Sequence, residues 1–276
     1  MKVYPILIIF LFRIPVLAQS TGIVPGVSAI HYPSQCLNLN AVGSALQFPA
    51  CGLDSAQLCV LLNNQFNAFD PSIQNQSMAI LGNVKPFGYK IGMAQFGNNL
   101  YQQQSMLMGL QLKLFDKVKM GAEFQFARSA ILGYQTYNMI GVAIGFAIPL
   151  NSYLFYLNKI GFHLNQTQEI KTPASLAYNH VLFVRPISTF AVYGNYLKTV
   201  ELQHAMFSLG CQLQLNQTLS SSMNFRPEQQ QLTLGLEFRL KKTQLVIETK
   251  LSQAIGVGYF LALSKYFAQN ERKTIR

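Results

Sequence analysis

Histidine and serine are the residues of this sequence best suited to acid–base or nucleophilic chemistry. Its four histidines are His31, His163, His180 and His204. His204 and Ser208 are spaced to share one face of a strand. A lipid-hydrolysing enzyme of a barrel would need such a pair on the outer wall, where it meets lipid. That face is the polar one of its segment, so we expect the pair to point inward, and we expect His180 and His204 in the lumen or at the rim. We therefore predict that the chain is not an enzyme.

The cysteines indicate neither a metal site nor a cofactor. Cys36, Cys51, Cys59 and Cys211 form no Cys-x-x-Cys motif, so a zinc or thioredoxin-like centre has no support. Cys36 and Cys51 are the candidates for a disulfide in an exported protein, because both fall in an irregular N-terminal region. Cys59 and Cys211 occupy apolar positions of predicted strands, where a thiol acts as a small hydrophobe.

Several charged residues fall within otherwise apolar segments, always on the more polar side. We expect these side chains to project into the interior of a barrel, because a Lys or Arg facing lipid costs about 2–4 kcal/mol at the membrane midplane. Their mixed signs favour pairing across strands, and lining a pore is the alternative. The predicted lumen-facing charges are Glu123, Glu237, Arg239, Glu248 and Lys250.

The elements that carry these charges alternate with period two, the pattern of strands. Residues 232–240 place leucine or phenylalanine at every second position, with Thr233, Gly235, Glu237 and Arg239 between them. A soluble sandwich and a membrane barrel both alternate in this way. The alternating segments run roughly 10–14 residues, enough for a tilted membrane strand and about twice the usual soluble length. Their length therefore favours the barrel.

About fourteen such segments can be counted, so the sequence predicts an all-β fold, a transmembrane antiparallel β-barrel over residues 57–268 with a tail at 269–276. The last segment closes in Tyr266-Phe267, which resembles the assembly signal of bacterial outer-membrane proteins. The predicted strands lie near residues 57–69, 76–84, 87–96, 103–115, 117–129, 137–149, 152–164, 175–185, 187–198, 202–215, 217–226, 229–240, 243–252 and 255–267.

Composition and the N-terminus agree with an exported membrane protein. Half of the residues are hydrophobic and only 11% are charged, against about 25% in soluble domains. Lys2, the apolar run 6–12 and a small-residue site ending at Ala18 predict a signal peptide over residues 1–18. The net charge of +11 is scattered, which favours contacts of turns and rims with outer-membrane lipid and argues against nucleic-acid binding.

Residues 19–56 lack alternation and are punctuated by proline and glycine, which predicts loop or short helix and a segment able to plug the lumen. The run 41–54, followed by the first strand, resembles the entry of the FadL-like barrels of Bacteroidota, which include the PorV and PorQ proteins of the type IX secretion system. Pro49, Ala50, Gly52 and Leu53 match the family's motif there and are the candidate plug residues.

The resemblance implies two functions for an integral outer-membrane barrel. The first is a non-enzymatic accessory or scaffold subunit of an envelope complex, related to type IX secretion, with envelope proteins as partners. The alternative is a FadL-like transporter of hydrophobic small molecules. A soluble secreted sandwich that binds a ligand is a third hypothesis, from a different class of protein.

Overall fold

The computed structural model describes most of the predicted barrel and a short stretch before it. The described residues are 49–51, 57–67, 74–84, 86–98, 100–114, 118–133, 136–166, 175–199, 205–252 and 256–268. The predicted signal peptide, Cys36, Gly52, Leu53 and the predicted tail lie outside the described residues. No helix among the described residues is long and apolar enough to cross a membrane.

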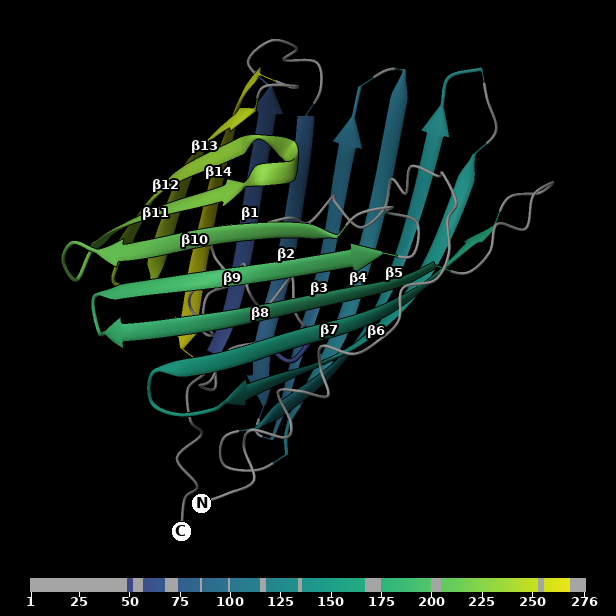
Figure 1. Ribbon diagram of the computed structural model, residues 1–276. Coiled ribbons are helices and arrows are strands. Elements are labelled where there is room, and N and C mark those ends of the chain that lie inside the picture. The colour runs from purple at the N-terminus through teal and green to yellow at the C-terminus, as the bar shows by residue number, and fades with distance from the viewer. Residues whose placement is uncertain are drawn as a thin grey trace.

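Within the described residues the chain forms fourteen strands and one short 3-10 turn, η2. Figure 1 shows β7 to β10 crossing the front of the molecule at a steep angle to β1 to β5 behind them. The elements are β1 (Gln57–Asn67), β2 (Gln74–Val84), β3 (Phe87–Gly97), β4 (Tyr101–Lys113), β5 (Lys119–Ile131), β6 (Tyr137–Pro149), β7 (Leu154–Gln166), β8 (Ser175–Ile187), β9 (Phe190–Thr199), β10 (Met206–Gln214), β11 (Leu219–Arg226), η2 (Pro227–Gln229), β12 (Gln231–Leu240), β13 (Thr243–Ser252) and β14 (Gly256–Ala268).

The strands form one closed antiparallel barrel. Each strand pairs with its neighbours in the sequence, and β1 pairs with β14 in register from Gln57↔Ala268 to Asn67↔Gly258. Closure leaves no free sheet edge, which is the condition for strands to span a bilayer. The predicted fold class is therefore confirmed.

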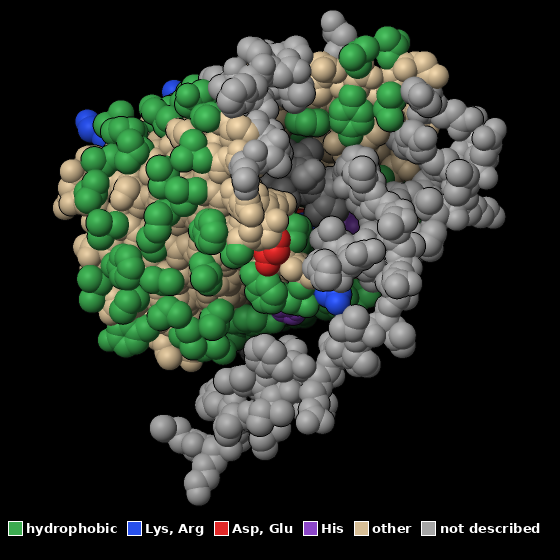
Figure 2. All heavy atoms as spheres, turned by 45° about the horizontal axis from the view of Figure 1, so that its top comes forward, with side chains coloured by type: hydrophobic (Ala, Val, Ile, Leu, Met, Phe, Trp, Pro, Cys, Tyr) green, Lys and Arg blue, Asp and Glu red, His purple; other side chains and the backbone are tan. Residues whose placement is uncertain are grey.

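The outer wall of the barrel is apolar. Leu62, Leu110 and Leu209 are 53%, 63% and 61% exposed, and their strands alternate these positions with buried ones. Figure 2 shows hydrophobic side chains spread over this wall. A soluble protein rarely exposes so continuous an apolar surface, whereas lipid tails solvate it. The hypothesis of a soluble sandwich is therefore wrong.

The turn between β12 and β13 contains only Lys241 and Lys242. Lys241 has a φ of +49°, in the left-handed region. Two-residue hairpin turns need positive φ because their twist must match that of the strands, and a side chain with a Cβ is strained there. The turn therefore holds its register at some conformational cost.

We expect Lys241→Gly to raise the free energy of unfolding by about 0.5–1 kcal/mol, because glycine adopts positive φ without strain. Lys242→Gly is the matched control and should be neutral or destabilising, since Lys242 lacks a positive φ. Urea unfolding in lipid vesicles, followed by tyrosine fluorescence, measures both. Equal stabilisation by the two variants would contradict the assignment of strain to Lys241.

Candidate functional site in the barrel interior

The inner wall carries two apolar clusters, whereas the alternation in the sequence predicted a largely polar lumen. Apolar cluster 1 gathers buried residues of β1, β2, β4, β13 and β14, and the ring of Tyr266 packs against it. Leu107, an apolar exception on the polar phase of its strand, belongs to this cluster. Its members are Cys59, Leu61, Ala79, Leu81, Leu107, Val246, Phe260 and Ala262.

Apolar cluster 2 lies on β6 to β9 and includes residues from the N-terminal segment. Ala50 and Cys51 are buried within it beside strand residues, and Phe155 packs against it. Ala50 and Cys51, which precede the first strand, thus lie inside the barrel. The members of the cluster are Ala50, Cys51, Ala147, Leu157, Val181, Phe183, Ala191 and Tyr193.

Pro49 lies against two inward glycines of β5 and β6. A Cβ built on Gly121 would stand 1.9 Å from the carbonyl oxygen of Pro49, and one on Gly145 would stand 3.0 Å from its Cδ. Only glycine allows this close approach of the two chain segments. Two of the four candidate plug residues, Pro49 and Ala50, are therefore buried in the lumen.

Glu123 lies between two lysines on the same stretch of inner wall. Its Oε1 pairs with Lys90, and its Oε2 lies 2.6 Å from the Nζ of Lys159. Lys90 reaches Glu123 by passing over Gly109, where a Cβ would stand 2.6 Å from the Lys90 Cε. Lys90 and Glu123 are 4% and 3% exposed. This buried ion triad binds β3, β5 and β7 together.

His163 extends this polar wall on β7. A Cβ on Gly141 of β6 would lie 2.5 Å from the Nδ1 of His163, so the imidazole lies across that glycine. Lys90, Lys159 and His163 were not predicted from the sequence to be lumen residues. The signal was present, because each occupies the phase opposite to large apolar residues of its strand.

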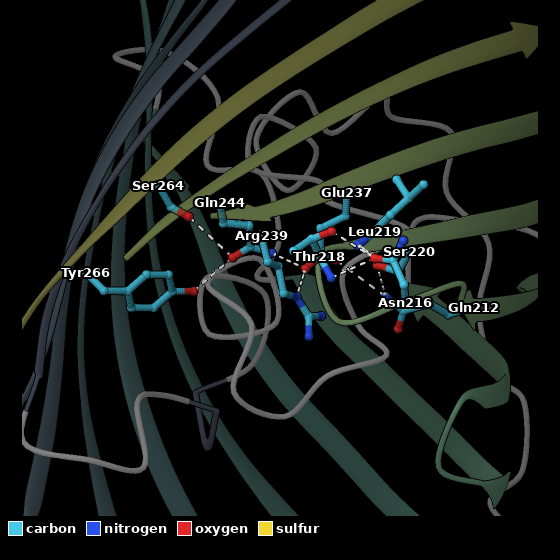
Figure 3. Close-up of polar contacts among 10 residues, drawn as sticks. All are labelled: Gln212, Asn216, Thr218, Leu219, Ser220, Glu237, Arg239, Gln244, Ser264 and Tyr266. Atoms are coloured by element: carbon cyan, nitrogen blue, oxygen red, sulfur yellow. Dashed lines mark hydrogen bonds and ion pairs between the residues drawn. The ribbon is translucent and has the colours of Figure 1, made fainter. Parts of the chain in front are cut away.

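A second polar network centres on Glu237 and crosses five strands from β10 to β14 (Figure 3). The carboxylate of Glu237 accepts hydrogen bonds from Gln212 at 3.4 Å, from Gln244 at 2.7 Å and from Arg239. Gln244 in turn accepts a hydrogen bond from the hydroxyl of Tyr266 at 2.9 Å. Glu237 thus links β12 to β10 and β13, whereas Arg239 pairs with Glu237 within β12.

Glu248 and Asn224 form a different kind of polar site. Both side chains are 1% exposed, on the inner phases of β13 and β11. Among the described residues, neither carboxylate oxygen of Glu248 nor either amide atom of Asn224 has a hydrogen-bond partner. Lys250 and Arg226 interact with Glu248 electrostatically. Lys250, the fifth predicted lumen charge, is half-buried on the same phase of β13.

His180 lies on the outer wall, so its predicted place in the lumen or at the rim is wrong. It occupies the phase opposite to the buried Val181, and its Nδ1 lies 2.6 Å from the hydroxyl of Tyr156. Both phases of β8 carry apolar side chains, so polarity alone did not identify the inner one. Ser208 is buried on its strand's inner phase, whereas His204 lies outside the described residues.

These side chains offer charge and hydrogen bonding but no assembled metal site. Within the described ranges, no three His, Cys, Asp or Glu residues are grouped to hold a metal ion. Figure 2 looks toward the upper end of Figure 1 and shows a hollow there, with acidic, basic and histidine side chains beside it. The arrangement can bind and orient a small molecule in an interior that is partly apolar and partly charged.

No family model matches the sequence, and no curated protein is significantly similar to it. Solved structures share the fold. The toluene transporter TodX of P. putida is 8% identical with a TM-score of 0.54, and the match covers 77% of this chain and 90% of that one. A Pseudomonas aeruginosa FadL homologue is 8% identical with a TM-score of 0.53, covering 84% and 95%.

The outer-membrane protein Omp33 of Acinetobacter baumannii is also 8% identical, with a TM-score of 0.54, covering 77% of this chain and 98% of that one. These solved structures and this chain share the fold of an outer-membrane β-barrel, and one of them is a FadL homologue. Together with the apolar outer wall, it confirms the predicted location as an integral protein of the outer membrane.

The ion triad predicts that Glu123→Gln destabilises the barrel by about 3–5 kcal/mol, because it removes the anion from between two largely buried lysines. Glu228→Gln is the control, since Glu228 is exposed and glutamine keeps an oxygen that accepts the Phe207 N–H. Urea midpoints in vesicles compare the two. Equal midpoints would contradict a stabilising role of the triad.

The contact of Pro49 with β5 predicts that Gly121→Ala displaces the segment 49–51. We expect faster labelling of Cys51, which is 2% exposed, by a water-soluble maleimide, with the labelled cysteine assigned by peptide mass spectrometry. Gly194→Ala is the control, because a Cβ there meets only Leu209, at 3.7 Å. An unchanged Cys51 labelling rate in a folded Gly121→Ala barrel would contradict the proposed seating of Pro49.

Proposed function

We propose that this chain is a non-enzymatic outer-membrane channel for hydrophobic small molecules. The observation that carries the proposal is the pair of apolar clusters on the inner wall. A barrel filled with water alone would gain by lining its lumen with polar side chains. Inward-facing apolar side chains instead give the interior hydrocarbon-like surroundings, which favour a hydrophobic solute by about 25 cal/mol per Å² of its surface removed from water.

The N-terminal segment fits such a channel as a plug. Pro49, Ala50 and Cys51 are buried against β5, β6 and cluster 2, so chain already occupies part of the lumen. Apolar solutes pass such a segment by contact with protein rather than through an open aqueous pore. Gly52 and Leu53 are proposed to continue the plug, as the resemblance implies.

One similar structure supports the same class of solute. TodX, which shares the fold with this chain, is a toluene transporter. Its similarity to this chain is one of fold, and one fold hosts many functions. The apolar clusters are the reason to carry the solute class over to this chain.

The proposal predicts that producing the chain in a Gram-negative host accelerates uptake of naphthalene. Leu107→Lys should return uptake to that of cells without the protein, because it places a charge in apolar cluster 1. Leu107→Met is the control and should retain uptake, since it preserves size and apolarity. Uptake of radiolabelled naphthalene by cells with equal amounts of folded barrel measures the effect. No acceleration by the unmodified chain would contradict the proposal.

An accessory role with envelope partners, related to PorV and PorQ, is the second candidate and rests on the sequence resemblance alone. Purification from native outer membranes in mild detergent, with mass spectrometry of co-purifying proteins, tests it. Stoichiometric partners would support it. A barrel that purifies alone and speeds naphthalene uptake would leave the channel as the function.

A further inference from the structure

Side chains from the strands on either side of β12 come together over Gly235. Ser222 of β11, Gly235 of β12 and Glu248 of β13 are successive partners across the sheet, all on the inner phase. A Cβ on Gly235 would stand 2.5 Å from the Ser222 Oγ and 3.4 Å from the Glu248 Cγ. Because Gly235 has no side chain, Ser222 and Glu248 lean over β12 toward each other.

Asn224 lies two residues beyond Ser222 on the same face, opposite Thr233 of β12. Asn224 and Glu248 are both 1% exposed, and four of their polar atoms have no partner among the described residues. Leaving such groups buried and unpaired destabilises a fold, so these atoms need water or a ligand as a partner.

The free atoms define the chemistry of that partner. They are two carboxylate oxygens, an amide oxygen and an amide N–H₂, an array rich in acceptors. A ligand that satisfies these atoms must therefore donate a hydrogen bond. Lys250 and Arg226 act electrostatically on Glu248, so the surroundings hold cations as well as an anion. The cations disfavour a cationic ligand, and the carboxylate disfavours an anion. A neutral hydroxyl group meets both conditions.

The buried apolar cluster 1 begins directly beside this array. Glu248 is the cross-strand partner of Phe260, a member of apolar cluster 1 together with Val246 and Ala262. We propose that Glu248 and Asn224 form a subsite that binds the hydroxyl group of a neutral amphipathic molecule whose hydrocarbon body lies on cluster 1. The inference deepens the proposed channel function and depends on it.

The test compares two probes of equal size, 4-octylphenol and 4-octyltoluene, which differ by a hydroxyl in place of a methyl group. Binding to the full chain in detergent is measured by calorimetry against a matched detergent blank. We expect 4-octylphenol to bind about tenfold more tightly, the value of one or two hydrogen bonds to charged or buried groups. Glu248→Leu and Asn224→Leu should each abolish most of this preference and leave 4-octyltoluene binding unchanged.

Two further variants separate the subsite from the stability of the barrel. Glu248→Gln keeps one acceptor oxygen and should retain part of the preference even if Glu248→Leu fails to fold. Thr249→Val changes the neighbouring residue on the opposite face of β13 and should retain all of it. Heat-dependent migration on SDS gels identifies the folded variants.

Three other outcomes would contradict either the subsite alone or the subsite together with the channel function. Equal affinity of the unmodified chain for the two probes overturns the subsite and leaves the channel standing. Equal loss of both probes in the folded Glu248 and Asn224 variants also overturns it, because the residues would then act through the structure. If the unmodified chain binds neither probe, the proposed channel function fails together with the subsite.

Discussion

The closed circle of backbone hydrogen bonds is the constraint on which the rest of this structure depends. Inside a bilayer no water is available to an unpaired N–H or C=O, so every strand needs two neighbours. The pairing of β1 with β14 over eleven residue pairs provides the last of them. Once the circle is closed, the two faces of each strand are assigned, one to lipid and one to the lumen.

Closure also limits how side chains can meet inside the barrel. Neighbouring inward positions are about 5 Å apart across the sheet. A charged side chain that pairs with a residue two strands away must therefore extend over the strand between them. Lys90 does so over Gly109, and Glu248 and Ser222 approach over Gly235. Inward glycines thus act as crossings, and the same property admits Pro49 beside Gly121. The contacts of Lys90 and Glu248 across a strand and the position of Pro49 thus depend on the same property of inward glycines.

The strands could be predicted because alternation and turn residues are local signals. β6 (Tyr137–Pro149) and β13 (Thr243–Ser252) begin and end as expected, and the other strands differ by a few residues at their ends. The orientation of Glu123 followed from phase in the same way. Its two lysine partners could not be predicted, because no single segment of the sequence determines the register between β3, β5 and β7. The predicted position of His180 was wrong because β8 carries apolar side chains on both faces.

The two apolar clusters are not equivalent, and their difference bears on where a solute would lie. Cluster 2 already includes Ala50 and Cys51, so protein from before the barrel satisfies part of its apolar surface. Cluster 1, among the described residues, is built from strand residues alone and adjoins the unpaired polar atoms of Glu248. Buried acceptors without a partner are unfavourable in a lumen without a ligand, and here they adjoin apolar side chains. Their contact at Phe260 makes one amphipathic molecule a better partner for this wall than water or a pure hydrocarbon.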